Sequence, residues 1–153
     1  METIPLYLTT KAESEASAGA LEGPPLVQWV RQHALSQGSE ARYVLWPRPD
    51  GNPAFALAAL AEPPTLWSIA ALATQLPKAR YSLETRYLGL DPEAESALQA
   101  ELLLGWCLEQ YRYSRYVTES RDLPELSLPP GAEAAAGEAA AWVGAITLVR
   151  DLI

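Results

Sequence analysis

The chain has 153 residues, of which 49% are hydrophobic, and its 11 Lys+Arg against 19 Asp+Glu give a formal net charge of -8. This length supports one hydrophobic core, and the acidic balance disfavours nucleic acid as a partner because it repels phosphate groups. No apolar run approaches the ~20 residues that span a bilayer, the N-terminus lacks a secretory signal, and one cysteine forms no internal disulfide, so a cytoplasmic protein without a membrane partner is expected.

The first third of the chain predicts one strand and one helix. Alternating apolar and polar residues predict a strand over residues 4–9. Residues 11–23 are small, polar and rich in Ala, Ser and Glu, which indicates a mobile surface loop. Prolines 24 and 25 fit the first turn of a helix over residues 24–37, which Gly38 would end. Its inward stripe is expected to contain Leu26, Trp29, Val30 and His33.

The middle of the chain predicts a hairpin, a helix and a strand. Two apolar runs, residues 41–46 and 54–61, flank a segment dense in Pro, Asp, Gly and Asn. This pattern is typical of two antiparallel strands joined by a loose loop. A helix over residues 65–76 follows and ends at Pro77, and residues 79–84 read as another strand.

The clearest helix is predicted over residues 91–113. Asp91 can cap the free amides of its first turn, and Pro92 fits the first helical position. Residues 102–108 are apolar on every face, which indicates a helix packed between a sheet and other helices. Gly105 costs roughly 1 kcal/mol of helix propensity, so we expect another backbone to approach closely at that position.

The C-terminal part predicts a polar connection at residues 118–122, an extended piece at 125–128 and a helix over 132–153. This last helix has none of the Gly, Asn or Pro signals that close helices, so we expect the chain to be a piece of a longer protein. Strands and helices alternate, which predicts the α/β class with a mixed sheet flanked by helices. Residues 1–131 would form the domain and residues 132–153 a linker helix.

Few side chains are candidates for chemistry. Only His33 and Cys107 could bind zinc as imidazole or thiolate, too few for a structural site. His33 is the sole possible imidazole base and is interpreted as a structural or surface residue, while Cys107 in an apolar helix is expected to be inert. Glu93, Glu95 and Glu101 fit helix-start and solvent-face roles. No phosphate-binding glycine motif is present.

One short stretch mixes basic and aromatic residues, at positions 111–116 (YRYSRY). Such a mixture could stack nucleic-acid bases. Because the whole chain is acidic, we interpret it as the aromatic end of a packed helix, with its two arginines paired to local acids.

Three stretches together resemble the leucyl (cytosol) aminopeptidase family. Residues 76–81 (LPKARY) look like a strand entry of compact members, and residues 104–116 (LGWCLEQYRYSRY) resemble the family's LGW-L--Y-F--Y helix, with Tyr113 where phenylalanine is usual. Residues 148–153 (LVRDLI) are similar to the start of its RDLINTPAN stretch. The resemblance covers about half the chain and identifies the junction between an N-terminal and a catalytic domain.

The resemblance implies a three-layer, macro-domain-like accessory domain joined by a helix to a catalytic domain that is absent from this sequence. In that domain the family holds two divalent metals, zinc or manganese, and its catalytic residues, so no catalytic, cofactor-binding or metal residue maps onto this chain. The parent would be an aminopeptidase, and homo-oligomers are usual in the family. The candidate interface toward the catalytic domain consists of Trp142, Ile146, Val149 and Ile153.

Two other readings stay open. The chain could be a stand-alone ligand-binding module of macro-domain type, or a self-contained hydrolase, for which it offers few suitable residues.

Overall fold

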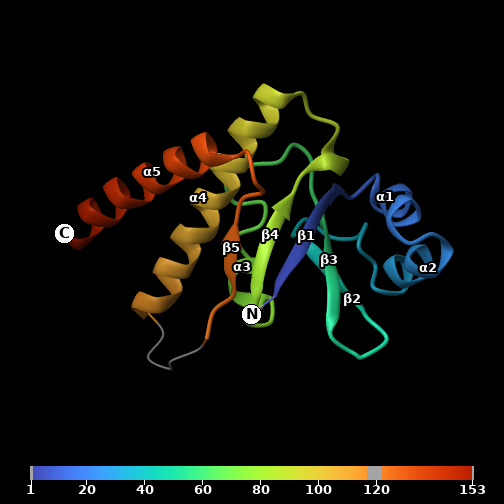
Figure 1. The fold of residues 1–153 in the computed structure, drawn as a ribbon. Helices are drawn as coiled ribbons and strands as arrows, with labels where there is room; N and C mark the ends of the chain where they lie inside the picture. Colours follow the sequence, from blue (N-terminus) through green and yellow to red (C-terminus); the bar gives the residue numbers. More distant parts are fainter. Residues whose placement is uncertain (1, 117–121, 153) are drawn as a thin grey trace.

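The computed structural model describes residues 2–116 and 122–152 (Figure 1). Its strands are β1 (Thr3–Thr10), β2 (Arg42–Pro47), β3 (Pro53–Leu60), β4 (Arg80–Glu84) and β5 (Glu125–Ser127). Its helices are α1 (Ser14–Leu21), α2 (Pro24–Gln32), α3 (Leu72–Gln75), α4 (Pro92–Tyr116) and α5 (Glu133–Asp151), with a 3-10 turn η1 at Arg86–Leu88. The strand order in the sheet is β2-β3-β1-β4-β5.

The sheet is mixed, with β1 at its centre. β1 pairs in parallel with β3, where Leu8 lies opposite Ala58, and with β4, where Leu6 lies opposite Leu83. β5 continues the parallel part beside β4, whereas β2 and β3 form the antiparallel hairpin that the turn-rich separator predicted. Parallel neighbours need crossover connections, and helices supply them.

Helices cover both faces of the sheet, so the molecule has three layers. One face packs against α3 and α4 through a cluster that includes Leu6, Leu72 and Trp106. The opposite face packs against α1 and α2 through Leu26 and Leu57, among others. Figure 1 shows α1 and α2 on one side of the sheet and α4 and α5 on the other. The α/β class with a helix-flanked mixed sheet is therefore confirmed.

The mobile loop predicted over residues 11–23 is wrong, because most of this segment is helix α1. Ala18 is fully buried, and the Ser17 hydroxyl lies 2.6 Å from the hydroxyl of Thr9 on β1. Small side chains that bury little area by themselves let this helix approach the sheet closely. The burial comes from tertiary packing, which local composition does not reveal.

The helix predicted over residues 65–76 is also wrong in extent, since only Leu72–Gln75 is α-helical. Before it, the Thr65 amide donates to the Ser68 hydroxyl at 2.7 Å, and the Trp67 amide donates to the Thr65 hydroxyl at 3.3 Å. After these capping contacts the backbone forms bonds between residues three apart, such as that from the Ala70 amide to the Trp67 carbonyl oxygen at 3.2 Å, in place of α-helical bonds. Similarly, α2 ends at Gln32, ahead of the predicted residue 37.

Helix α4 confirms its prediction in position, cap and packing. The Asp91 carboxylate accepts a 2.8 Å bond from the Ala94 amide. A Cβ added at Gly105 would overlap the backbone carbonyl of Leu66, so this glycine permits the close approach that was expected. The longest helix therefore packs directly against the backbone of the segment that precedes α3.

The C-terminal elements β5 and α5 lie near their predicted positions. The predicted polar connection at residues 118–122 lies, except for Asp122, outside the described residues. None of the helices in the described part is both long and apolar enough to cross a membrane.

Candidate functional site

Helix α5 packs along α4 through small side chains. Ala135 and Ala139, one turn apart on α5, are buried. Alanines on one face allow two helix axes to approach closely. This contact decides which side of α5 faces the protein and which side is left open.

Polar groups fasten the C-terminal end of α5 to α4. Arg115 of α4 lies 3.2 Å from the Asp151 carboxylate and donates to the Tyr111 hydroxyl at 2.8 Å. The Tyr111 hydroxyl in turn donates to Asp151. Because Arg115 and Asp151 are both largely exposed, this cluster orients the helix more than it stabilises it.

The outward side of α5 is apolar from Ala141 onward, after the exposed Glu138. Its exposed large side chains are Trp142 (55% exposed), Leu148 (62%), Val149 (56%) and Leu152 (78%). With Ala141 and Ala145, which are also exposed, they occupy an arc of about 120° on the helix. We call these six residues the α5 face. It borders the side that packs on α4, so it is a continuous apolar surface without a cover among the described residues.

The four residues of the predicted candidate interface differ in their exposure on this helix. Trp142 and Val149 belong to the α5 face, whereas Ile146 is half-buried at the border with the packed side. Ile153 lies outside the described residues. Leu148 and Leu152 were missed, although both are apolar and near the end of the helix. Only the orientation of α5 on α4 distinguishes the outward residues from the inward ones.

The two residues considered for metal or nucleophile chemistry are not brought together. His33 lies at the end of α2, exposed, with its Nδ1 3.0 Å from the Trp29 carbonyl oxygen and its ring stacked on Trp29 at 5.3 Å. Cys107 lies on α4, on the opposite face of the sheet, and burial raises the pKa of its thiol. The described part of the chain contains no group of three His, Cys, Asp or Glu arranged to hold a metal ion. The divalent metals implied by the resemblance therefore find no matching ligand set in this part.

The carboxylates on α4 contact neighbouring side chains or face solvent. Glu95 accepts a 2.6 Å bond from the Thr85 hydroxyl, which also accepts a 3.2 Å bond from the Gln99 amide. Glu93 and Glu101 are distributed along the same helix, with Glu101 exposed. These contacts tie the start of α4 to the end of β4.

The arginines of the 111–116 stretch are paired to acids, as predicted. Arg112 lies 3.9 Å from the Glu109 carboxylate, and Arg115 lies beside Asp151. Their positive charges are thus partly compensated within the domain.

The fold defines a class: a three-layer α/β domain with an exposed apolar face on its C-terminal helix. Residues 4–129 match the family described as "M17 aminopeptidase, N-terminal domain", and the chain belongs to this family. The resemblance read from the sequence is therefore confirmed.

The fold is also similar to a crystal structure of cytosol aminopeptidase from Coxiella burnetii. The TM-score is 0.71 at 18% sequence identity, over 94% of this chain and 29% of that one. The chain thus spans less than a third of the length of that relative. The comparison with curated proteins found no matching sequence.

Proposed function

We propose that the chain is the non-catalytic N-terminal domain of a metal-dependent exopeptidase of the leucyl aminopeptidase type. Residues 1–131 form the accessory domain, and residues 132–153 are the helix that leads to the catalytic domain. The parent removes N-terminal residues from peptides, using two divalent metals, zinc or manganese, that the catalytic domain binds. It is a cytoplasmic homo-oligomer. Membership in the M17 N-terminal domain family supports this proposal.

The single observation that carries the proposal is the α5 face. Fully burying a large apolar side chain is worth about 1.5–3 kcal/mol, and four such side chains are more than half exposed on α5. A cover over this face would therefore stabilise the protein. A domain that continues the chain after α5 begins beside the face, which makes it the favoured partner. The role of the contact is in assembly, stability or access of substrate.

Peptidase assays test the proposal. The chain alone, supplied with manganese or zinc, is expected to leave a leucyl amide substrate intact, whereas the parent protein cleaves it. The coding sequence after Ile153 is expected to encode Asn-Thr-Pro, followed by a Lys-, Asp- and Glu-rich metal site. Cleavage by the chain alone, or a continuation without these residues, would contradict the proposal.

A hollow at the carboxyl ends of the parallel strands favours a second candidate, a ligand-binding module of macro-domain type. Its volume is about 430 Å³, and it is lined by Thr10, Glu62, Pro63, Pro64, Leu88 and Leu90. In α/β sheets ligands bind at this end, where neighbouring connections diverge. Glu13 and Glu15 at the start of the nearby α1 would repel a phosphate group, so the accessory role is preferred.

A thermal-shift experiment with ADP-ribose separates the two candidates. A bound ligand at 100 times its Kd adds about 2.7 kcal/mol of stability. No shift is expected for an accessory domain, and a saturable shift would favour the module.

A further inference from the structure

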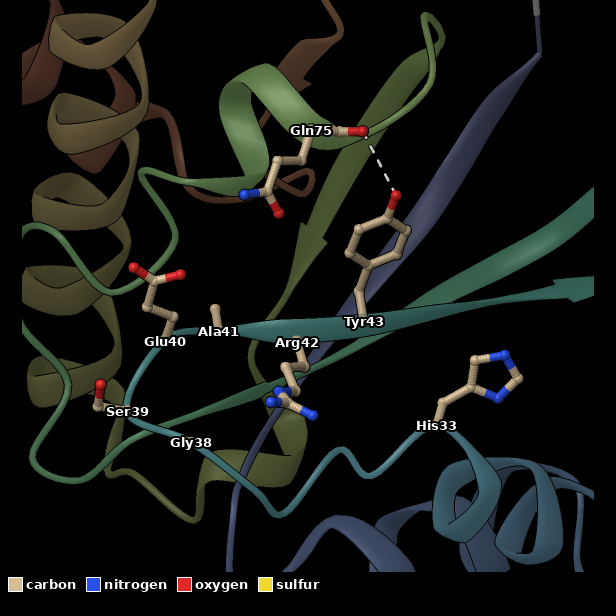
Figure 2. A pocket seen from close by; sticks show the side chains of 8 residues that line it. All are labelled: His33, Gly38, Ser39, Glu40, Ala41, Arg42, Tyr43 and Gln75. Carbon is tan, nitrogen blue, oxygen red and sulfur yellow. Dashed lines mark hydrogen bonds between the residues drawn. The ribbon is translucent and has the colours of Figure 1, made fainter.

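A second hollow, separate from α5, opens on the outer edge of the sheet where β2 begins. Its volume is about 500 Å³, and β2 is the edge strand. Figure 2 shows the lining residues, which are His33, Gly38, Ser39, Glu40, Ala41, Arg42, Tyr43 and Gln75. They come from the loop before β2, from β2 itself, and from the ends of α2 and α3. Most of them carry hydrogen-bonding side chains.

Arg42 brings a positive charge to this hollow that no carboxylate among the described residues neutralises. Seven other basic side chains of the described part form ion pairs with Asp or Glu. Arg42 instead donates to the Ala34 carbonyl oxygen, at the long distance of 3.3 Å.

Lys11 adds a second positive charge nearby. Its ammonium group donates to the Gln37 carbonyl oxygen at 2.8 Å, on the same loop that Arg42 contacts. Burial, and after it the charge of Arg42, lower the pKa of Lys11. The positive charges of Lys11 and Arg42 therefore repel each other, and an anion bound beside Arg42 would reduce this repulsion.

Glu40 supplies the opposite charge at the other side of the hollow. Figure 2 shows its carboxylate on one side of β2, together with Gln75, and the Arg42 guanidinium on the other side, nearer His33. The described structure contains no ion pair between Glu40 and Arg42. The Tyr43 hydroxyl, which donates to the Gln75 carbonyl oxygen at 3.3 Å, lies on the Glu40 side. The hollow thus presents a cation and a carboxylate that do not neutralise each other.

We propose that this hollow binds a short peptide as a zwitterion. The ligand carboxylate bonds to Arg42, in the field of Lys11, and the ligand ammonium group lies against Glu40. Guanidinium and carboxylate groups match in shape and form strong charge-assisted hydrogen bonds. The site goes beyond the proposed accessory role and does not use the α5 face. The choice of a peptide as ligand rests on the proposed function, since an aminopeptidase takes up peptides.

Titration of the isotopically labelled 153-residue chain by nuclear magnetic resonance tests the site. Leucylglycine is expected to shift the backbone amide signals of Ser39, Arg42 and Gln75 in a saturable manner. Its N-acetylated and its C-amidated forms each lose one charge and should bind about tenfold more weakly, the loss typical of one charge-assisted hydrogen bond.

Two variants assign the charges. Arg42→Gln should weaken leucylglycine about tenfold, and Glu40→Gln should remove the preference for the free amine over the acetylated form. Arg80→Gln is the matched control, because Arg80 is an exposed arginine on β4 that is paired with Glu125, and it should change nothing. Absence of any saturable shift, or equal binding of all three ligands, would overturn the site. Neither result bears on the accessory role, because no peptidase activity is measured.

Discussion

Gly105 is the residue where α4 meets the backbone before α3. Alanine there would gain up to about 1 kcal/mol of helix propensity. Its Cβ, however, would lie 2.9 Å from the Leu66 carbonyl carbon and closer still to the oxygen. Backbone atoms cannot move aside as the end of a flexible side chain can. We therefore expect Gly105→Ala to lower the free energy of unfolding by about 1–3 kcal/mol, measured by urea denaturation.

A matched control for Gly105 lies on α5. Gly137 is helical and exposed, and a Cβ added to it would meet no atom within 4 Å. Gly137→Ala should therefore raise stability by up to about 1 kcal/mol. If both alanine variants raised stability, the close contact between α4 and Leu66 would be refuted.

Tyr81 predicts how stability depends on alkaline pH. Its buried hydroxyl donates to the Pro77 carbonyl oxygen at 2.9 Å, and burial, followed by the charge of Tyr43, raises its pKa from 10 to about 12. Between these values the unfolded chain has lost the phenolic proton and the folded chain retains it. The contribution of the protonated Tyr81 hydroxyl to the free energy of unfolding is thus complete below pH 10 and is lost as pH rises toward 12. Tyr81→Phe should flatten this decline in denaturant unfolding, and an unchanged slope would contradict the assignment.

An element could be predicted from the sequence when the residues that determine it lie within the element itself. Helix α4 could be predicted because Asp91, Pro92 and its apolar middle act locally, within the helix and its first turn. Helix α1 could not, because Ala18 and Ser17 become buried only through contact with β1, and small residues give no apolar stripe. The segment before α3 has an apolar pattern, but its backbone bonds join residues three apart, as between Ala70 and Trp67, so it is not α-helical.

Gln110 joins three elements, which makes it a probe of their assembly. Its side-chain amide donates to the Ala73 carbonyl oxygen at 3.1 Å and to the Pro124 carbonyl oxygen at 2.6 Å. Glutamate at this position has no donor when ionised, so Gln110→Glu should destabilise the fold by about 1–3 kcal/mol at neutral pH.

Acid should reverse part of this loss, because the protonated carboxyl group of the introduced glutamate can donate a hydrogen bond. The two carbonyl oxygens that it faces disfavour the ionised form and therefore raise its pKa. The difference from the parent chain is measured by denaturation at neutral and acid pH. Gln28→Glu, at an exposed position of α2, adds the same charge and should cost little at either pH. A constant deficit at both pH values would mean that the amide bonds are not the cause.

At the scale of the whole molecule, the sequence indicates that α5 is apolar but not which of its sides is open. Trp142 and Val149 are exposed, whereas Ile146 is half-buried because Ala135 and Ala139 determine how α5 sits on α4. The charged hollow at β2 gave no sequence signal at all, since the loop around residue 38 brings Lys11 and Arg42 together only in the fold.

The α5 face predicts the behaviour of the chain in isolation. Without a cover, its apolar side chains should drive self-association, and a charge placed among them should prevent it because a carboxylate resists burial. We therefore expect the wild-type chain to sediment as an oligomer at high concentration and Trp142→Glu to sediment as a monomer. Trp67→Glu is the control: Trp67 is 52% exposed, close to the 55% of Trp142, but lies outside α5, so its variant should still associate. An oligomer that survives Trp142→Glu would mean that the α5 face is not the contact surface.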